Sequence, residues 1–362
     1  MRYIFMVLIT LLAVLCAACQ PVPVMVDMPP EPSLEVVAAE TYLAEQQGIF
    51  DQAAQECIER HLATYRRRGG RGTVGIYFLE LASGFSAGHE ANKTLHLETG
   101  EDIGYFNTAS VAKLPMAFVA YALADQGRLD LDTPHFDEVT NRTWDLRPMI
   151  HRMITHSIND YHNILLRLIG PQLATETLTA CGMPYTRLSR ELQPAVGASD
   201  VNCLKRYGTL LAPRTTPAEL GRLLSELYFG QALAPQSNSE MLDALQNTQF
   251  NSRIPAGVGE GVQVAHKTGT SPEERIYNDA ALVLLPENPF VLVILSRGAS
   301  SHVTRTMREL TSELYAYARQ RVEAGTVLGI EQALSSLNEA LEDTIPTQLQ
   351  PDASTLLRAE QP

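Results

Sequence analysis

Basic residues are scarce in this sequence. The 362 residues include 28 Lys and Arg against 41 Asp and Glu, so the formal net charge is -13 and the isoelectric point is near 5.2. Binding to a phosphate backbone would bring like charges together, so we expect no nucleic acid partner. Hydrophobic residues make up 45% of the chain, which is enough for a large core and excludes disorder throughout.

A membrane-spanning length of apolar sequence is also lacking at the N-terminus. The apolar run from Ile4 to Leu15 follows Arg2 and is too short to cross a bilayer comfortably. It is typical of an export signal. The next residues, Cys16-Ala17-Ala18-Cys19, resemble the bacterial lipobox, although Cys16 stands where leucine is usual. The alternative is a soluble secreted protein that is cut near Ala18.

The lipobox resemblance implies a signal peptide over residues 1–19 and lipidation of Cys19. Residues 20–38 then form a tether, because five prolines between Gln20 and Ser33 keep the chain extended. An acyl anchor and an exported domain predict an enzyme at a membrane surface, on the extracytoplasmic side. We expect it to be a monomer.

Cysteine is rare as well, with five residues in the chain. Lipidation would leave side-chain thiols only at Cys57, Cys181 and Cys203, and no zinc-type spacing links them. A disulfide is permitted outside the cytoplasm, and Cys181 and Cys203 are the pair closest in sequence. A bridge between them is a hypothesis, because distance does not follow from sequence separation.

The remaining pattern predicts a mixed α/β (α+β) domain over residues 39–322, with 323–362 as an unassigned tail. A helix is expected from Leu34 to Arg68, interrupted at Gly48, and another opens at Thr216 with a proline at its first position. Short loops between the later strands favour an antiparallel sheet formed by N- and C-terminal strands, with an inserted helical lobe. The expected strands are 74–81, 86–89, 262–270, 277–285 and 290–297, and the other helices are 111–124, 160–169 and 303–322.

Ser110-Val111-Ala112-Lys113 is the first candidate for chemistry. The three-residue spacing places the hydroxyl and the amine on one helical face, where a lysine of lowered pKa can accept the serine proton. A capping serine beside a solvated lysine would give the same four residues. The flanking residues are apolar all round, however, so Lys113 has little route to water.

Two further triplets follow. Ser157-Ile158-Asn159 lies before a helix capped by Asn159 or Asp160, at a loop position where side chains can face a cleft. Lys267-Thr268-Gly269 lies on a strand, where glycine allows close approach of another chain. The triplet Ser336-Leu337-Asn338 in the tail shows that Ser-x-Asn alone is weak.

In this order the three motifs resemble those of class A β-lactamases and penicillin-binding proteins. The resemblance to class A β-lactamases covers roughly Thr73 to Arg297. The residues that carry it, besides the three motifs, are Phe106-Asn107-Thr108-Ala109, Asn163, Thr186-Arg187-Leu188, Thr215-Thr216-Pro217, Arg253-Ile254-Pro255, Val264-Ala265-His266 and Thr270.

The resemblance implies a role for each motif residue. Ser110 would attack an amide carbonyl with Lys113 as base, and Ser157, supported by Lys267, would pass a proton to the leaving nitrogen. Asn159 would hold the substrate side-chain amide. The substrate carboxylate would bind Thr268 and Thr270 beside Gly269, and the backbone N–H groups of Ser110 and Thr270 would form the oxyanion hole. No cofactor is required.

One departure from the family concerns deacylation. Class A β-lactamases carry a Glu-x-x-Leu-Asn run after the Thr-Arg-Leu stretch, whereas this chain has Glu191 one place early and lacks the asparagine. The segment up to Pro213 is also longer than expected. Glu191 is therefore either an exposed loop residue or a deacylation base re-aimed by the longer loop.

These observations predict a serine hydrolase that forms an acyl-enzyme with a small-molecule β-lactam or with D-alanyl amides of cell-wall peptides. Two alternatives remain open. One is a D,D-peptidase of peptidoglycan, which the missing deacylation pattern favours, and the other is a β-lactam sensor that acylates and stops. The nearby His151, His156 and His162 are interpreted as non-ligands, since spacings of five and six do not share a helical face.

Overall fold

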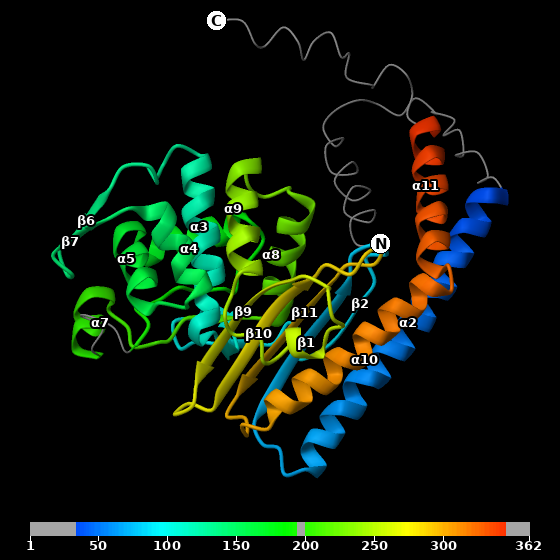
Figure 1. The fold of residues 1–362 in the computed structure, drawn as a ribbon, viewed down its shortest axis with the longest axis horizontal. Helices are drawn as coiled ribbons and strands as arrows, with labels where there is room; N and C mark the ends of the chain where they lie inside the picture. The colour runs from blue at the N-terminus through cyan, green and yellow to red at the C-terminus, as the bar shows by residue number, and fades with distance from the viewer. Residues whose placement is uncertain (1–33, 194–199, 345–362) are drawn as a thin grey trace, which may run out of the picture.

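A five-stranded antiparallel sheet lies between a helical lobe and a layer of terminal helices (Figure 1). The computed structural model describes residues 34–193 and 200–344. The expected signal, Cys19, most of the tether and residues 345–362 lie outside these ranges. In spatial order the strands are β2 (Ser86–His89), β1 (Thr73–Glu80), β11 (Phe290–Arg297), β10 (Ile276–Val283) and β9 (Val264–Ser271).

The sheet confirms the predicted fold class, because strands from both ends of the chain complete it. Strand β1 pairs with β11, and β11 with β10, all antiparallel. The expected strand bounds are right to within two residues, since apolar runs that end at turn residues mark them. Strand β9 forms one edge of the sheet, so one side of its backbone faces away from its only partner strand, β10.

The inserted lobe covers one face of the sheet. Buried side chains of β10 and β11, such as Leu282 and Val293, pack there against α8. The helices of this lobe are α3 (Lys113–Asp125), α4 (Leu146–Thr155), α5 (Asn159–Ile169), α6 (Pro171–Ala180), α7 (Asp200–Tyr207), α8 (Pro217–Phe229) and α9 (Pro235–Gln246).

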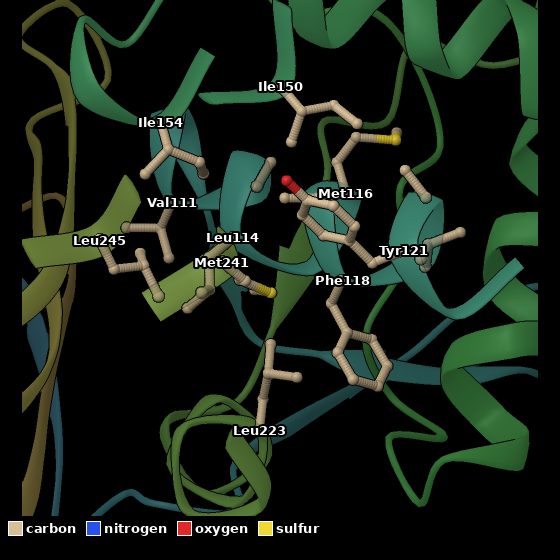
Figure 2. Packing of buried hydrophobic residues seen from close by; sticks show 14 of the residues in the cluster. Val111, Leu114, Met116, Phe118, Tyr121, Ile150, Ile154, Leu223, Met241 and Leu245 are labelled. Carbon is tan, nitrogen blue, oxygen red and sulfur yellow. The ribbon is translucent and has the colours of Figure 1, made fainter. Parts of the chain in front are cut away.

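Helix α3 is the centre of the lobe, and its core residues are apolar on every side. Leu114, Met116, Phe118 and Tyr121 point in different directions into the packing of neighbouring helices (Figure 2). All are at most 1% exposed. Such a helix is held by the lobe around it, which fixes the position of Lys113 at its first residue.

Short elements connect the lobe to the sheet. The expected start of α8 is confirmed, because the Thr216 hydroxyl accepts a hydrogen bond from the Glu219 backbone N–H. The expected helix 111–124 begins instead with a 3₁₀ turn. These short elements are η1 (Ala109–Ala112), η2 (Pro255–Gly257) and the strand pairs β3 (Thr94–His96) with β4 (Asp102–Gly104), β5 (Phe106–Asn107) with β8 (Arg214–Thr215), and β6 (His135–Asp137) with β7 (Arg142–Trp144).

The terminal helices cover the other face. The expected interruption at Gly48 is wrong, because helix α2 (Leu34–Arg67) runs through it. Helix α11 (Thr326–Thr344) follows α10 (Val303–Glu323), in the tail that the sequence pattern leaves unassigned. Tertiary packing explains both findings, because α11 buries Ile330 in the core that α2 also joins. This packing outweighs the cost of about 1 kcal/mol for a glycine inside a helix at Gly48. Within the described ranges, no helix combines the length and apolar character needed to cross a bilayer.

Candidate active site

Ser110 lies in η1, where the lobe meets the edge strand β9. The preceding residue, Ala109, has φ +43. This backbone conformation is unusual for a residue other than glycine, and such conformations concentrate at functional sites. A Cβ at Gly269 would lie 2.5 Å from the Thr108 carbonyl oxygen and 2.9 Å from the Val111 nitrogen. Glycine at this position therefore lets β9 approach the nucleophile turn closely.

Lys113 is fully buried, as its apolar neighbours predict. Its Nζ donates to Ser110 Oγ at 2.9 Å and to Asn159 Oδ1 at 2.6 Å, with Ser157 Oγ at 3.4 Å. Burial, together with the charge of Lys267, lowers the pKa of Lys113 well below its usual value. A neutral amine beside the serine hydroxyl can act as its proton acceptor.

Ser157 connects the two buried lysines. It lies between α4 and α5 with φ +57, a left-handed backbone conformation that few non-glycine residues adopt. Lys267 Nζ donates to Ser157 Oγ at 2.9 Å. Burial lowers the pKa of Lys267 to about 7, although the Asp279 carboxylate opposes this shift. A hydroxyl between two amines is placed to relay a proton.

Asn159 lies at the start of α5 and faces the cleft. The expectation of a cap at Asn159 or Asp160 is wrong, because α5 begins at Asn159 and its N-cap residue, Ile158, makes no side-chain cap hydrogen bond. The Asn159 side chain instead accepts from Lys113 and donates from Nδ2 to the Gln193 carbonyl at 3.2 Å. It therefore links Lys113 to the backbone at Gln193 across the cleft.

The triplet on β9 forms the other wall, and an arginine that carried no role in the sequence interpretation supports it. Thr268 is nearly buried, whereas Thr270 is exposed. Arg253 is 7% exposed and donates to the Gly269 carbonyl at 3.0 Å and to Thr270 Oγ1. Its position in Arg253-Ile254-Pro255 was the only sequence signal, and Arg253 adds a second basic group to this wall beside Lys267.

These walls enclose a cleft of about 550 Å³. Ser110, Asn159 and Thr270 lie on its surface, so the nucleophile is accessible, whereas Lys113 is buried behind it. The other residues along the cleft are Asn107, Ala109, Arg190, Glu191, Leu192, Gln193, Ala212, Pro213, Ser271, Pro272, Glu273 and Glu274.

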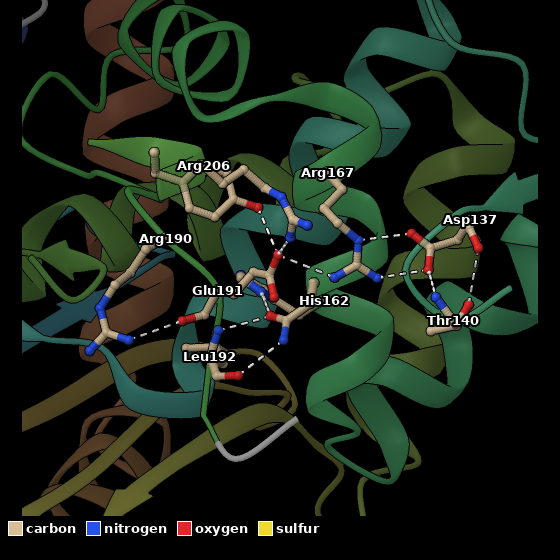
Figure 3. Close-up of polar contacts among 10 residues, drawn as sticks. Asp137, Thr140, His162, Arg167, Arg190, Glu191, Leu192 and Arg206 are labelled. Atoms are coloured by element: carbon tan, nitrogen blue, oxygen red, sulfur yellow. Dashed lines mark hydrogen bonds and ion pairs between the residues drawn. The ribbon is translucent and has the colours of Figure 1, made fainter. Parts of the chain in front are cut away.

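Glu191 is not the exposed loop residue considered above, since its side chain is fully buried (Figure 3). Its Oε1 forms ion pairs with Arg206 and, at 3.2 Å, with Arg167, and it accepts from the Tyr207 hydroxyl at 2.9 Å. Arg206 and Tyr207 lie on α7, within the longer segment noted in the sequence. The extra residues thus bring a cation and a hydroxyl to this carboxylate.

The backbone next to Glu191 is fixed by Asn163 of α5. Asn163 Nδ2 donates to the Leu192 carbonyl at 3.0 Å, and the Leu192 N–H donates back to Asn163 Oδ1 at 2.8 Å. Arg167, also on α5, binds Asp137 as well as Glu191 (Figure 3). Helix α5 therefore positions this wall of the cleft.

The three histidines that we interpreted as non-ligands each bond to different partners. His151 pairs with Asp243, and His156 bonds to Thr155 and Gln249. His162 is buried against Asn163, and burial with the nearby Lys113 lowers its pKa to about 3.

The disulfide hypothesis is wrong, because Cys181 and Cys203 are both free thiols. Cys181 follows the end of α6, beside Arg222 and Glu226, whereas Cys203 is buried on α7. Closeness in sequence therefore did not bring the two thiols together.

Comparison with known proteins gives the same answer as the motifs. The model of the beta-lactamase enzyme family matches residues 58–318. A β-lactamase of Streptomyces cellulosae is 27% identical over 268 residues, which cover 70% of this chain and 80% of that protein. The structure of PBP-A has a TM-score of 0.59 at 22% identity, covering 73% of this chain and 96% of its own. A variant of the last common ancestor of Gram-negative bacterial class A β-lactamases has a TM-score of 0.60 at 24% identity, covering 74% and 99%. The chain belongs to the β-lactamase enzyme family.

Proposed function

We propose that this protein hydrolyses β-lactams through an acyl-enzyme on Ser110. The observation that carries the proposal is the continuous set of hydrogen bonds from Ser110 through Lys113 and Ser157 to Lys267. Contact between a hydroxyl, an amine of lowered pKa and a second hydroxyl supports the roles of nucleophile, base and proton relay for Ser110, Lys113 and Ser157.

Acylation then follows from these positions. Lys113 takes the Ser110 proton as Oγ bonds to the lactam carbonyl carbon, and the backbone N–H groups of Ser110 and Thr270 would bind the carbonyl oxygen. The C–N bond breaks, and the nitrogen receives a proton through Ser157, which Lys113 or Lys267 reprotonates. Each correctly placed oxyanion donor is worth about 3 kcal/mol in such a step.

Substrate binding uses the β9 wall. The substrate carboxylate would accept from Thr268 and Thr270 near the cations of Lys267 and Arg253, because these groups gather positive charge at one place on the edge strand. The amide of the substrate side chain would meet Asn159 on the opposite wall. The cleft therefore suits a substrate that carries a carboxylate on one side of its lactam bond and a side-chain amide on the other.

Deacylation is the step that we expect to be slow. It requires a carboxylate that activates water, and the Glu191 carboxylate is engaged by Arg167, Arg206 and Tyr207. Loss of a positioned general base typically slows the step it serves by about 100- to 10,000-fold. The acyl-enzyme should therefore accumulate.

Intact mass during incubation with benzylpenicillin, followed over time, tests this directly. We expect rapid addition of one penicillin mass, slow loss of it, and a nitrocefin burst whose size is proportional to enzyme. Steady hydrolysis without a burst would contradict slow deacylation, and no adduct at all together with no hydrolysis would contradict the function itself.

A second candidate is a D,D-peptidase, and the engaged Glu191 favours it because a peptidase has no need of fast penicillin deacylation. Release of D-alanine from a D-alanyl-D-alanine peptide, measured beside nitrocefin hydrolysis, separates the two. A higher kcat/KM on the peptide would select the peptidase. An adduct with no turnover of either compound would select a sensor.

We further propose that the enzyme is exported and lipidated at Cys19, which the residue pattern near the N-terminus supports. Cys19→Ala should release the protein from membranes and leave penicillin labelling unchanged, because the anchor and the fold are joined by the Pro-rich segment. Membrane retention of this variant would remove the proposal.

A further inference from the structure

A thiol, an imidazole and a carboxylate meet on the side of the sheet away from the cleft. Cys57 and His61 are four residues apart on α2 and so share one helical face, and Glu313 of α10 lies opposite them. One ligand atom from each of the three lies within 4.8 Å of the other two. The proposed chemistry at Ser110 uses none of them.

We propose that Cys57, His61 and Glu313 bind a single transition-metal ion of the zinc type, at a site separate from the active site. Sulfur, imidazole nitrogen and carboxylate oxygen form a donor set that suits zinc. Zinc bonds of about 2.0 to 2.3 Å set donor separations of about 3.3 to 3.7 Å in a tetrahedron. His61 Nε2 and Glu313 Oε2 are already 2.9 Å apart, so small side-chain rotations close the set.

The surroundings give an ion a way in. A cavity of about 380 Å³ is lined by Cys57, Arg60, Glu313 and Tyr317, among others. Cys57 is buried at 5% exposure, whereas the Glu313 side chain is 42% exposed. The sulfur therefore lies at the inner end and the carboxylate at the mouth, which leaves the fourth position of the ion for water.

Metal binding at Cys57 must displace the thiol proton. Burial, and then the charge of Glu313, raise the pKa of the Cys57 thiol to about 12. As the metal–sulfur bond forms, the thiol proton is released to solvent, so Cys57 becomes a thiolate only when the ion binds. Glu313 is already ionised, because its hydrogen bonds with Arg60 hold its pKa at about 2.

Arg60 competes with the ion for Glu313. Its guanidinium binds both carboxylate oxygens, with Nη1 at 2.9 Å from Oε2. The Arg60 side chain is 55% exposed, and ion pairs this accessible contribute little. Removal of Arg60 should therefore tighten metal binding, whereas removal of a true ligand should weaken it.

Titration of the full-length protein with Co²⁺, after treatment with a chelator, tests the site. We expect one equivalent to bind with a thiolate-to-cobalt charge-transfer band that Zn²⁺ abolishes by displacement. Cys57→Ser should remove the band, and the matched variants Cys181→Ser and Cys203→Ser should keep it. His61→Gln and Glu313→Gln should weaken affinity by about 100-fold or more, and Arg60→Gln should strengthen it several-fold.

Absence of the charge-transfer band, or a band that survives Cys57→Ser, would overturn the proposal. Should Cys57→Ser fail to fold, His61→Gln gives the same decision, because its side chain is partly exposed and unchanged affinity there rules the site out. Penicillin labelling in the same variants is expected to stay unchanged, so this test and the test of the proposed function are independent.

Discussion

The two walls of the cleft both hold buried charged groups, but the groups meet different neighbours. One wall, which we call the acylation wall, comprises Ser110, Lys113, Ser157 and the β9 triplet. Here Lys113 and Lys267 face each other across Ser157, and burial and the charge of Lys267 lower the pKa of Lys113. On the deacylation wall, Glu191 meets Arg167 and Arg206, which are opposite charges. Like charges produce a reactive amine, whereas opposite charges hold a carboxylate in place.

The largest effect is expected at the nucleophile. Ser110→Ala should abolish covalent labelling by a fluorescent penicillin, because its Oγ is the hydroxyl that both faces the cleft and accepts a hydrogen bond from Lys113. Ser336→Ala is the matched control, since this serine of the second Ser-x-Asn lies exposed on α11. Labelling that persists in Ser110→Ala would place the nucleophile elsewhere.

The base should rank next. Lys113→Ala should slow acylation by about 10,000-fold, the upper range for loss of a positioned general base, measured as the rate of benzylpenicillin adduct formation. Residues that act as one unit lose activity non-additively. Nitrocefin hydrolysis by the double variant should therefore be no slower than by Ser110→Ala alone, and a much slower double variant would contradict a shared step.

A smaller effect should appear in the pH dependence of acylation. The pKa of Lys267 is about 7, so its ammonium fraction falls as pH rises, and binding of the substrate carboxylate should weaken. We expect kcat/KM to fall about fivefold between pH 7 and pH 8. Lys267→Arg, charged throughout, should flatten the profile, and a flat wild-type profile would contradict this role.

The acylation wall could be predicted from the sequence because its residues carry local signals. The three-residue spacing of Ser110 and Lys113 and the apolar flanks gave both contact and burial, and the glycine after Lys267-Thr268 indicated the close approach seen at Thr108. Apolar runs bounded by turn residues gave the strands for the same reason. These features can be recognised within a few consecutive residues.

The other features depended on contacts between distant segments. The continuity of α2 through Gly48 and the existence of α11 follow from packing of one terminus on the other. Arg253 reaches Thr270, 17 residues away, through the fold. The Glu191 carboxylate pairs with Arg167 on α5, outside the loop, and with Arg206 on α7, 15 residues further along the loop, and neither pairing follows from local spacing.

The last and smallest effect on activity tests the deacylation wall. Glu191→Gln keeps the shape of the side chain but leaves Arg167 and Arg206 without their shared charge. We expect the free energy of unfolding to fall by about 3 kcal/mol, measured by urea denaturation, because one partner of a buried ion pair is removed. Arg60→Gln, which breaks an exposed pair on α2, is the control and should cost less than about 1 kcal/mol. Decay of the penicillin adduct should change little, because Arg167, Arg206 and Tyr207 already bind the Glu191 Oε1 atom. Fast wild-type turnover that becomes a burst in Glu191→Gln would show the opposite, that the longer segment re-aims this carboxylate as the deacylation base.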